Sequence, residues 1–230
     1  MDWSAFRVSI ALGLWTLLLL VPPSLLLSRW LAWRRFPGRA LVEAAVAVPL
    51  VLPPTVLGFY LLEGVGADTT LGRAYRAVTG GELVFSFEGL VLASVLFNLP
   101  FAVQPMQRAF EAIPQGVREA AVTCGLSAWR AFWRVELPLA WPGLLSAVVL
   151  VFAHTLGEFG VVLMVGGNIP GETRTLSIAI YDRVQAFDEP AAARMSLFLL
   201  VVSVAAIAAT IRLGRGAGRD VSRRARRGGS

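Results

Sequence analysis

Two ionisable side chains stand four residues apart inside a long apolar stretch, and they are the first candidates for chemistry. His154 is the only histidine of the 230 residues, and Glu158 follows it about one helical turn later. Ionisable groups inside a membrane span cost about 2.5–3.5 kcal/mol each by insertion scales, so they usually face protein or water and tend to be functional. At positions i and i+4 they share one helix face and are placed to pair. The spacing favours either a structural pair that holds helices together or a polar lining of a translocation path.

Catalysis is the less favoured use of these side chains. One histidine and one glutamate make a poor metal site, and the acids Glu43 and Glu88 fall near the ends of apolar stretches. The sequence has no Ser or Cys nucleophile beside a base, no phosphate-binding glycine loop and no HExxH motif. We therefore predict no catalytic residue, no metal ligand and no cofactor, with an intramembrane enzyme as a remote alternative.

Prolines indicate where the helices around this pair bend. Pro49, Pro53 and Pro54 interrupt the second apolar stretch, and Pro100 and Pro105 interrupt the third. Each proline leaves backbone groups that a bilayer tolerates only where protein or water satisfies them again. Simple kinks explain this pattern, and so do helices that bend around an aqueous path. The candidate path residues are His154, Glu158, Asn98, Pro53 and Pro54.

The elements that must position these residues are membrane spans. The chain is 56% hydrophobic and only 16% charged, whereas about a quarter of the residues in soluble domains are charged. A span needs roughly 20 apolar residues, and stretches of this kind fall at about residues 8–27, 41–62, 85–104, 139–165 and 195–213. The sequence thus predicts an all-α polytopic membrane protein with five transmembrane helices in a single domain over residues 5–213.

The net charge of +6 could suggest a nucleic-acid partner, but the distribution of the charges along the chain argues against one. Most arginines gather between residues 29 and 39, between 108 and 134, and between 212 and 227, in alternate connections of the chain. Excess arginine marks the cytoplasmic side of a membrane, so we expect the N-terminus outside and the C-terminus inside. Residues 214–230 have nothing to bury and predict a basic, disordered cytoplasmic tail beside the lipid bilayer. We expect no nucleic-acid partner.

The inner connection over residues 106–137 combines a helix, a stop and a second helix. Pro114 suits the first turn of a helix over residues 115–123, and Gly125 suits the left-handed conformation that ends it. Ser127 is placed to cap a second helix that carries Trp129 and neighbouring aromatic residues on one face. Pro138 would then open the fourth span. Composition alone favours an interfacial amphipathic helix.

The register of this connection resembles the coupling loop of ABC importer permeases. Glu119-Ala-Ala is followed after three residues by Gly125 and after nine more by Val135-Glu-Leu-Pro138. The likeness extends over about residues 5–213, because residues 50–60 (LVLPPTVLGFY) and 156–160 (LGEFG) are similar to segments of the molybdate and sulfate permeases. Residues 168–175 (NIPGETRT) resemble the molybdate branch. His154 stands where this family usually carries Arg. The resemblance assigns ATPase coupling to Arg118, Glu119, Ala120, Ala121, Gly125, Leu137 and Pro138.

This resemblance implies the membrane subunit of an importer for molybdate, and for tungstate, with the fold of ABC type I importer permeases. A second copy of the chain, a cytosolic ATPase dimer and an extracytoplasmic molybdate-binding protein would complete it in the bacterial cytoplasmic (inner) membrane. ATP hydrolysis would belong to the ATPase subunits, so the chain itself is expected not to be an enzyme. The alternatives are a sulfate or thiosulfate permease and, more remotely, an ATP-independent channel or secondary transporter.

Overall fold

All regular structure in the described part of the chain is helical. The structure is a computed structural model that describes residues 2–227, except for the side chains of residues 209–210 and 213–227. Its helices are α1 (Trp3–Trp33), α2 (Arg39–Val51), α3 (Pro54–Val65), α4 (Thr70–Thr79), α5 (Phe87–Glu111), α6 (Gln115–Thr123), α7 (Ala128–Ala131), the π-helical turn η1 (Phe132–Glu136), α8 (Leu137–Gly157), α9 (Gly160–Gly166), α10 (Leu176–Gln185) and α11 (Glu189–Arg227).

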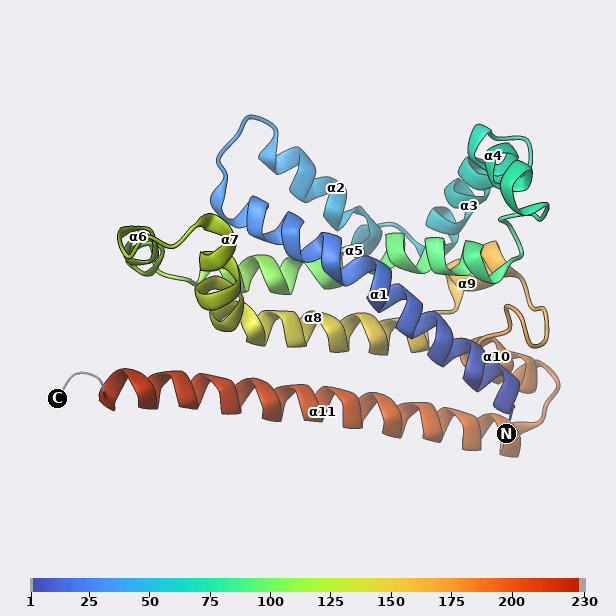
Figure 1. Cartoon of the computed structure of the whole chain (residues 1–230). Helices are drawn as coiled ribbons and strands as arrows, with labels where there is room; N and C mark the ends of the chain where they lie inside the picture. Colours follow the sequence, from blue (N-terminus) through green and yellow to red (C-terminus); the bar gives the residue numbers. More distant parts are fainter. Residues whose placement is uncertain (1, 228–230) are drawn as a thin grey trace.

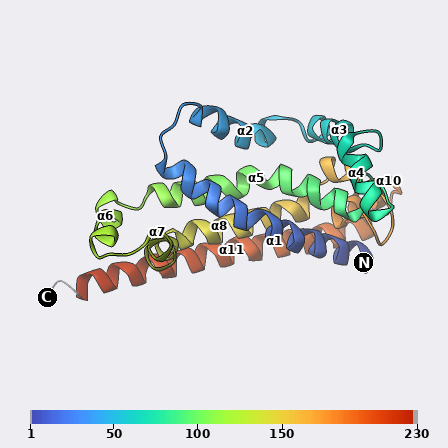
Figure 2. The same ribbon diagram turned by 45° about the horizontal axis from the view of Figure 1, so that its top comes forward.

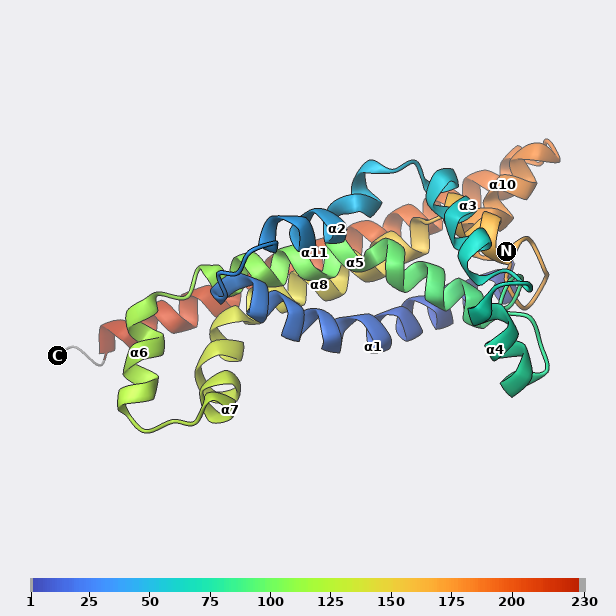
Figure 3. The same ribbon diagram turned by 90° about the horizontal axis from the view of Figure 1, so that it is seen from above.

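The long helices form a bundle with shorter helices at both ends. Helices α1, α5, α8 and α11 run side by side along the molecule (Figure 1). Helices α6 and α7 lie at one end, here called the α6–α7 end, and α4, α10 and the N-terminus lie at the other, here called the α4–α10 end (Figures 1 and 3). Figure 2 shows α2 and α3 lying above α5, outside the bundle. The start of α1 and the far end of α11 therefore lie at opposite ends of the molecule.

Four helical segments are long and apolar enough to cross a membrane, and a bent pair supplies the fifth candidate. The prediction of an all-α polytopic protein is confirmed, but the second predicted span is not one straight helix. Helix α2 ends before Leu52, and α3 restarts at Pro54 after a bend of 113°. Pro53 has no N–H to donate and disfavours the helical region for the residue before it. At this position the helix stops at Val51 and a new one begins at Pro54.

The fourth predicted span, over residues 139–165, is also interrupted. Helix α8 ends at Gly157, and Glu158 has extended backbone angles (φ −68°, ψ 132°) before α9 begins at Gly160. The first span is longer than predicted, because α1 continues through Pro22 and Pro23 to Trp33. Helix α11 continues into the predicted tail, but the side chains of that segment lie outside the description. The disorder predicted for residues 214–230 stays a prediction.

Candidate functional site

The residues that carry the resemblance form a short helix that closes on a glycine. Helix α6 spans Gln115–Thr123, as predicted, although Pro114 precedes it as the N-cap and does not lie in its first turn. Gly125 has φ +74°, which confirms the left-handed conformation. Its N–H donates to the Val122 carbonyl, and the Leu126 N–H donates to the Ala121 carbonyl, so the free carbonyls at the helix end are satisfied.

Helix α6 divides the motif between an inner and an outer face. Ala121 is buried, and the Arg118 guanidinium lies over the Trp33 ring. Glu119, Ala120 and Val122 face outward, with the Val122 side chain 70% exposed. A hollow of about 430 Å³ lies along this outer face, between Gln115 and Thr123. The helix thus presents a partly apolar ridge at the α6–α7 end of the molecule (Figure 3).

The segment after Gly125 turns the chain back into the bundle. The Ser127 hydroxyl accepts the Arg130 N–H at 3.4 Å, so Ser127 caps the second helix, as predicted. Leu137 and Pro138 open α8, which also agrees with the prediction. The π-helical turn between them was not predicted. It places Glu136 inside the protein, where Arg29 of α1 binds its carboxylate. Both residues were missed in the sequence, although an arginine inside an apolar helix is itself a signal.

A hydrogen-bonded polar cluster joins α1, α5 and α8 inside the bundle. Thr16 donates to Ser94 at 2.8 Å, and Asn98 Nδ2 donates to the Ser94 carbonyl at 2.8 Å and to the Thr155 hydroxyl at 3.1 Å. Asn98 Oδ1 lies 3.1 Å from His154 Nδ1. Two members of the candidate path, Asn98 and His154, are therefore brought together. The His154 ring also stacks on two phenylalanine rings of α5, Phe97 and Phe101.

The predicted pairing of His154 with Glu158 is wrong. Because α8 ends at Gly157, the two residues do not share one helix face. Glu158 instead accepts the Val161 N–H at 3.0 Å and so binds a free donor in the first turn of α9. Its own carbonyl accepts the Ser177 hydroxyl from α10. The carboxylate therefore stabilises the restart of the interrupted span.

The two helix interruptions lie against each other. A Cβ atom built on Gly160 would come within 2.8 Å of Pro54 Cβ, and one built on Gly58 within 2.7 Å of Met164 Cβ. Helices α3 and α9 therefore pack closely where the second and fourth predicted spans are broken. The structure places Pro54 and Glu158 of the candidate path at this junction, and Pro53 directly before it.

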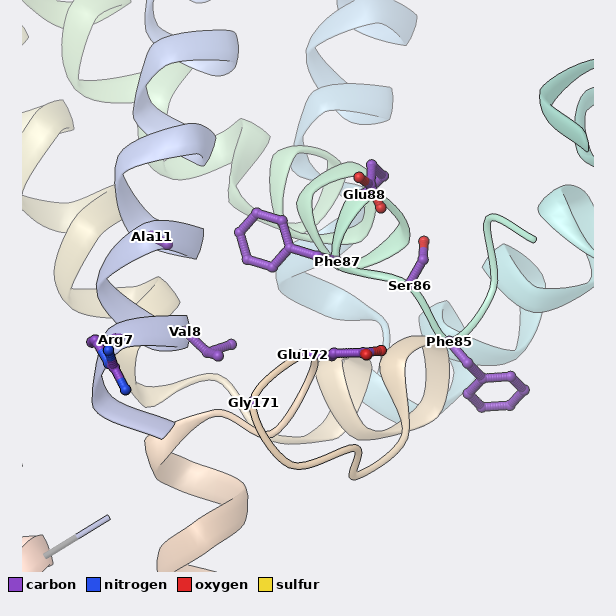
Figure 4. A pocket seen from close by; sticks show the side chains of 9 residues that line it. All are labelled: Arg7, Val8, Ala11, Phe85, Ser86, Phe87, Glu88, Gly171 and Glu172. Atoms are coloured by element: carbon purple, nitrogen blue, oxygen red, sulfur yellow. The ribbon is translucent and has the colours of Figure 1, made fainter. Parts of the chain in front are cut away.

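The segment that resembles the molybdate branch is a loop held together by hydrogen bonds of its own side chains and of Asp182. Asn168 Nδ2 donates to both carboxylate oxygens of Asp182 at 3.0 Å, and Arg174 Nε donates to Asn168 Oδ1 at 2.6 Å. Beside this loop lies a cavity of about 530 Å³ (Figure 4), lined by Arg7, Val8, Ala11, Phe85, Ser86, Phe87, Glu88, Gly171 and Glu172. With two carboxylates and one guanidinium, this cavity is poorly matched to a dianion. Among the described residues, no three His, Cys, Asp or Glu side chains form a metal-binding group.

Comparison with known proteins identifies the family. Residues 24–219 match the family described as "Binding-protein-dependent transport system inner membrane component". The chain is 48% identical to the molybdenum transport system permease protein ModB of Azotobacter vinelandii, over 81% of this chain and 83% of that protein. It is 34% identical to the sulfate transport system permease protein CysT of Escherichia coli, over 87% of this chain and 69% of that protein.

A solved structure shows the same fold. A bacterial ABC transporter involved in the import of the acidic polysaccharide alginate superposes with a TM-score of 0.74 at 17% identity, covering 93% of this chain and 78% of that chain. The predicted ABC permease fold is confirmed, and the chain is a multi-pass membrane protein. It belongs to the family of binding-protein-dependent transport system inner membrane components.

Proposed function

We propose that the chain is the permease subunit of an ATP-driven importer for molybdate, with tungstate as a second substrate. The observation that carries the proposal is helix α6, which is closed by Gly125 two residues after its end and lies with its outer face uncovered at one end of the bundle. The substrate follows from the molybdenum permease that is similar over most of both chains. The sulfate permease is less similar, so sulfate is the second candidate.

The importer would contain two copies of this chain, two cytosolic ATPase subunits and an extracytoplasmic molybdate-binding protein. Solved transporters of this fold support the kind of partner, since one is described in complex with a substrate-bound periplasmic protein. Helix α2 supports a contact with a second copy or with lipid, because Leu41 and Val51 are 75% and 81% exposed. The ATPase subunits would dock on the outer face of α6. The chain itself would carry no ATP chemistry.

Transport would proceed by alternating access. ATP-driven closure of the ATPase subunits would displace α6, and the bundle would switch between outward-open and inward-open shapes. Two spans are already divided near the contact of Pro54 with Gly160, one between α2 and α3 and the other between α8 and α9. The two helices of each span would then tilt separately. We assign the hinge of this motion to the two interruptions.

The polar cluster supports a weak and passing contact with the anion. Asn98 already donates to Ser94 and Thr155, so its Oδ1 is the acceptor and His154 Nδ1 is the donor between the two side chains. In the neutral form, His154 would then present the lone pair of Nε2, which does not bind an anion. A dianion would have to exchange with donors that are already in use. A site of this kind releases its cargo easily, as import requires.

The decisive experiment is reconstitution of the permease with its ATPase and binding protein in liposomes. We expect molybdate to stimulate ATP hydrolysis and to accumulate inside, with excess sulfate competing poorly. Strong competition by sulfate would move the assignment to the sulfate branch. Anion flux that continues without ATP would identify a channel or a secondary transporter instead.

A further inference from the structure

An ion pair with a buried carboxylate joins the end of α1 to the start of α8. Arg29 Nε donates to Glu136 Oε2 at 2.6 Å, and its Nη2 donates to Oε1 at 3.2 Å, which is a two-point contact. The Glu136 side chain is only 7% exposed, whereas the acids of the other ion pairs between described side chains are 36% exposed or more. The Glu136 carboxylate is therefore held in the protein interior, while the Arg29 side chain is 31% exposed.

Aromatic rings extend the pair to two further helices. The Arg29 guanidinium lies 5.0 Å from the Trp33 ring and 5.6 Å from the Phe132 ring. The Arg118 guanidinium of α6 also lies on the Trp33 ring, 3.9 Å from its centre. The indole N–H of Trp33 donates to the Phe110 carbonyl near the end of α5. We call this group the inner node. Its five side chains (Arg29, Trp33, Arg118, Phe132 and Glu136) connect α1, α6 and η1, with α5 bound through its backbone.

The π-helical turn gives the node its position. In η1 the Leu137 N–H donates to the Phe132 carbonyl five residues back. The wider turn directs Phe132 and Glu136 inward, while Trp133 and Arg134 stay exposed. π-Helical turns are rare and are frequently found at functional sites. This one lies directly between the α6 segment and the span α8.

We propose that Arg29 and Glu136 are positioning residues that transmit the movement of α6 to α1 and α8. The proposal rests on the function proposed above. A displacement of α6 reaches Trp33 through Arg118, and the Arg29–Glu136 pair passes it to the first turn of α8. Stability alone does not require this pair, because a buried ion pair replaced by apolar side chains of similar size often leaves a protein equally stable or more so. A rigid and directional connection does require it.

This difference defines the test. In the reconstituted transporter, the double variant R29M/E136M should keep its thermal midpoint and its ATP hydrolysis. The number of molybdate ions imported per ATP should fall about tenfold, which lies within the range that mutations between coupled sites produce. The variant R29K keeps the charge but loses the planar two-point contact. Its number of imported ions per ATP should lie between those of the wild type and R29M/E136M. The matched control is R76M/E82M, which removes an exposed ion pair beside α4 and should change nothing.

A spectroscopic measurement covers the case in which R29M/E136M does not fold. Spin labels on Cys124, the exposed free cysteine of the described chain, and on a cysteine replacing exposed Leu150 of α8 are each paired with a label on a cysteine replacing exposed Leu96 of α5. Cys124→Ser is added when Leu150 carries the label, and the two distances report whether the two segments move together. In the wild type, ATP should shift both labels relative to α5. In E136Q it should shift only the label on Cys124.

The outcomes separate the two proposals. If R29M/E136M or E136Q imports as many ions per ATP as the wild type, or if both labels still move together in E136Q, the node is structural and the inference is wrong. If the wild-type complex hydrolyses ATP and both labels move without molybdate uptake, the proposed substrate is wrong, and the node is then judged by the label movements alone.

Discussion

Gly125 is constrained by its backbone angle and not by its neighbours. A Cβ atom built there would meet nothing within 4 Å, yet its φ is +74°. The sequence predicts such a residue well, because a helix stop is local chemistry. Ser127 and Pro138 were also predicted correctly, for the same reason. Arg29 and Glu136 were not predicted, because their contact joins residues 107 positions apart, and nothing in the local pattern names the partner.

Gly125→Ala should therefore weaken coupling without unfolding the bundle. A side chain in the left-handed region costs about 1 kcal/mol, and the strain falls on the end of α6. We expect ATP-dependent uptake to fall severalfold while membrane insertion is normal. The control is Gly116→Ala in the same helix, where the backbone is helical and the space is equally open. Equal uptake by both variants would remove Gly125 from the coupling segment.

The partner of His154 is tested by two double-mutant cycles on the unfolding free energy of the purified protein. Interhelical polar contacts average about 0.6 kcal/mol in membranes, so His154→Ala and Asn98→Ala should be coupled by about that amount. His154→Ala and Glu158→Gln should be additive, because the two side chains bind different groups. Coupling in the second cycle and none in the first would restore the original prediction. A fall in uptake per folded His154→Ala transporter would support the path assignment.

At the scale of elements, the spans were predicted more reliably than their interruptions. Hydropathy depends on composition, so apolar stretches reveal all five candidate spans. Whether a stretch stays straight depends on what lies beside it. Pro53 and Pro54 stop one helix, whereas Pro22 and Pro23 lie inside an intact one. Glu158 seemed an intrahelical partner because the sequence does not show that α8 ends one residue earlier.

The junction between the two interrupted spans leads to a packing prediction. Gly160→Ala would place its Cβ 2.8 Å from Pro54 Cβ, and overpacking of this kind costs about 1–3 kcal/mol. We expect lower thermal stability and slower uptake, because α3 and α9 must separate. The control is Gly157→Ala, whose added methyl group meets nothing within 4 Å. If the two variants have the same melting temperature, the close contact at the junction is not present in solution.

For the whole molecule, the distribution of arginines along the chain matches the way the bundle places its connections. The arginine-rich connections gather at the α6–α7 end, and the N-terminus lies at the α4–α10 end (Figure 1). The arrangement of the helices could not be predicted from composition alone, since hydropathy does not say which spans touch. The resemblance supplied it, and the superposition with a solved transporter confirms it.

Sided labelling tests the orientation in the membrane. Exposed Cys124 should react with an impermeant thiol reagent only from the cytoplasmic side. Val78→Cys, at a site that is 86% exposed on α4, should react only from outside when combined with Cys124→Ser. Right-side-out and inverted vesicles give both measurements. Labelling of both positions from the same side would mean that α5, the span between them, does not cross the membrane.

The buried hydrogen bond between Thr16 and Ser94 has a consequence for synthesis. Its two partners are separated by 78 residues, and a ribosome adds about 5–20 residues per second. The first helix therefore waits on the order of several seconds in the insertion machinery or in lipid before its partner emerges. During that time the buried hydroxyl groups of Ser9, Thr16 and Ser28 lack the partners that later segments supply. Nascent chains halted before α5 should therefore be held by an insertase or degraded, and those halted after it should be released.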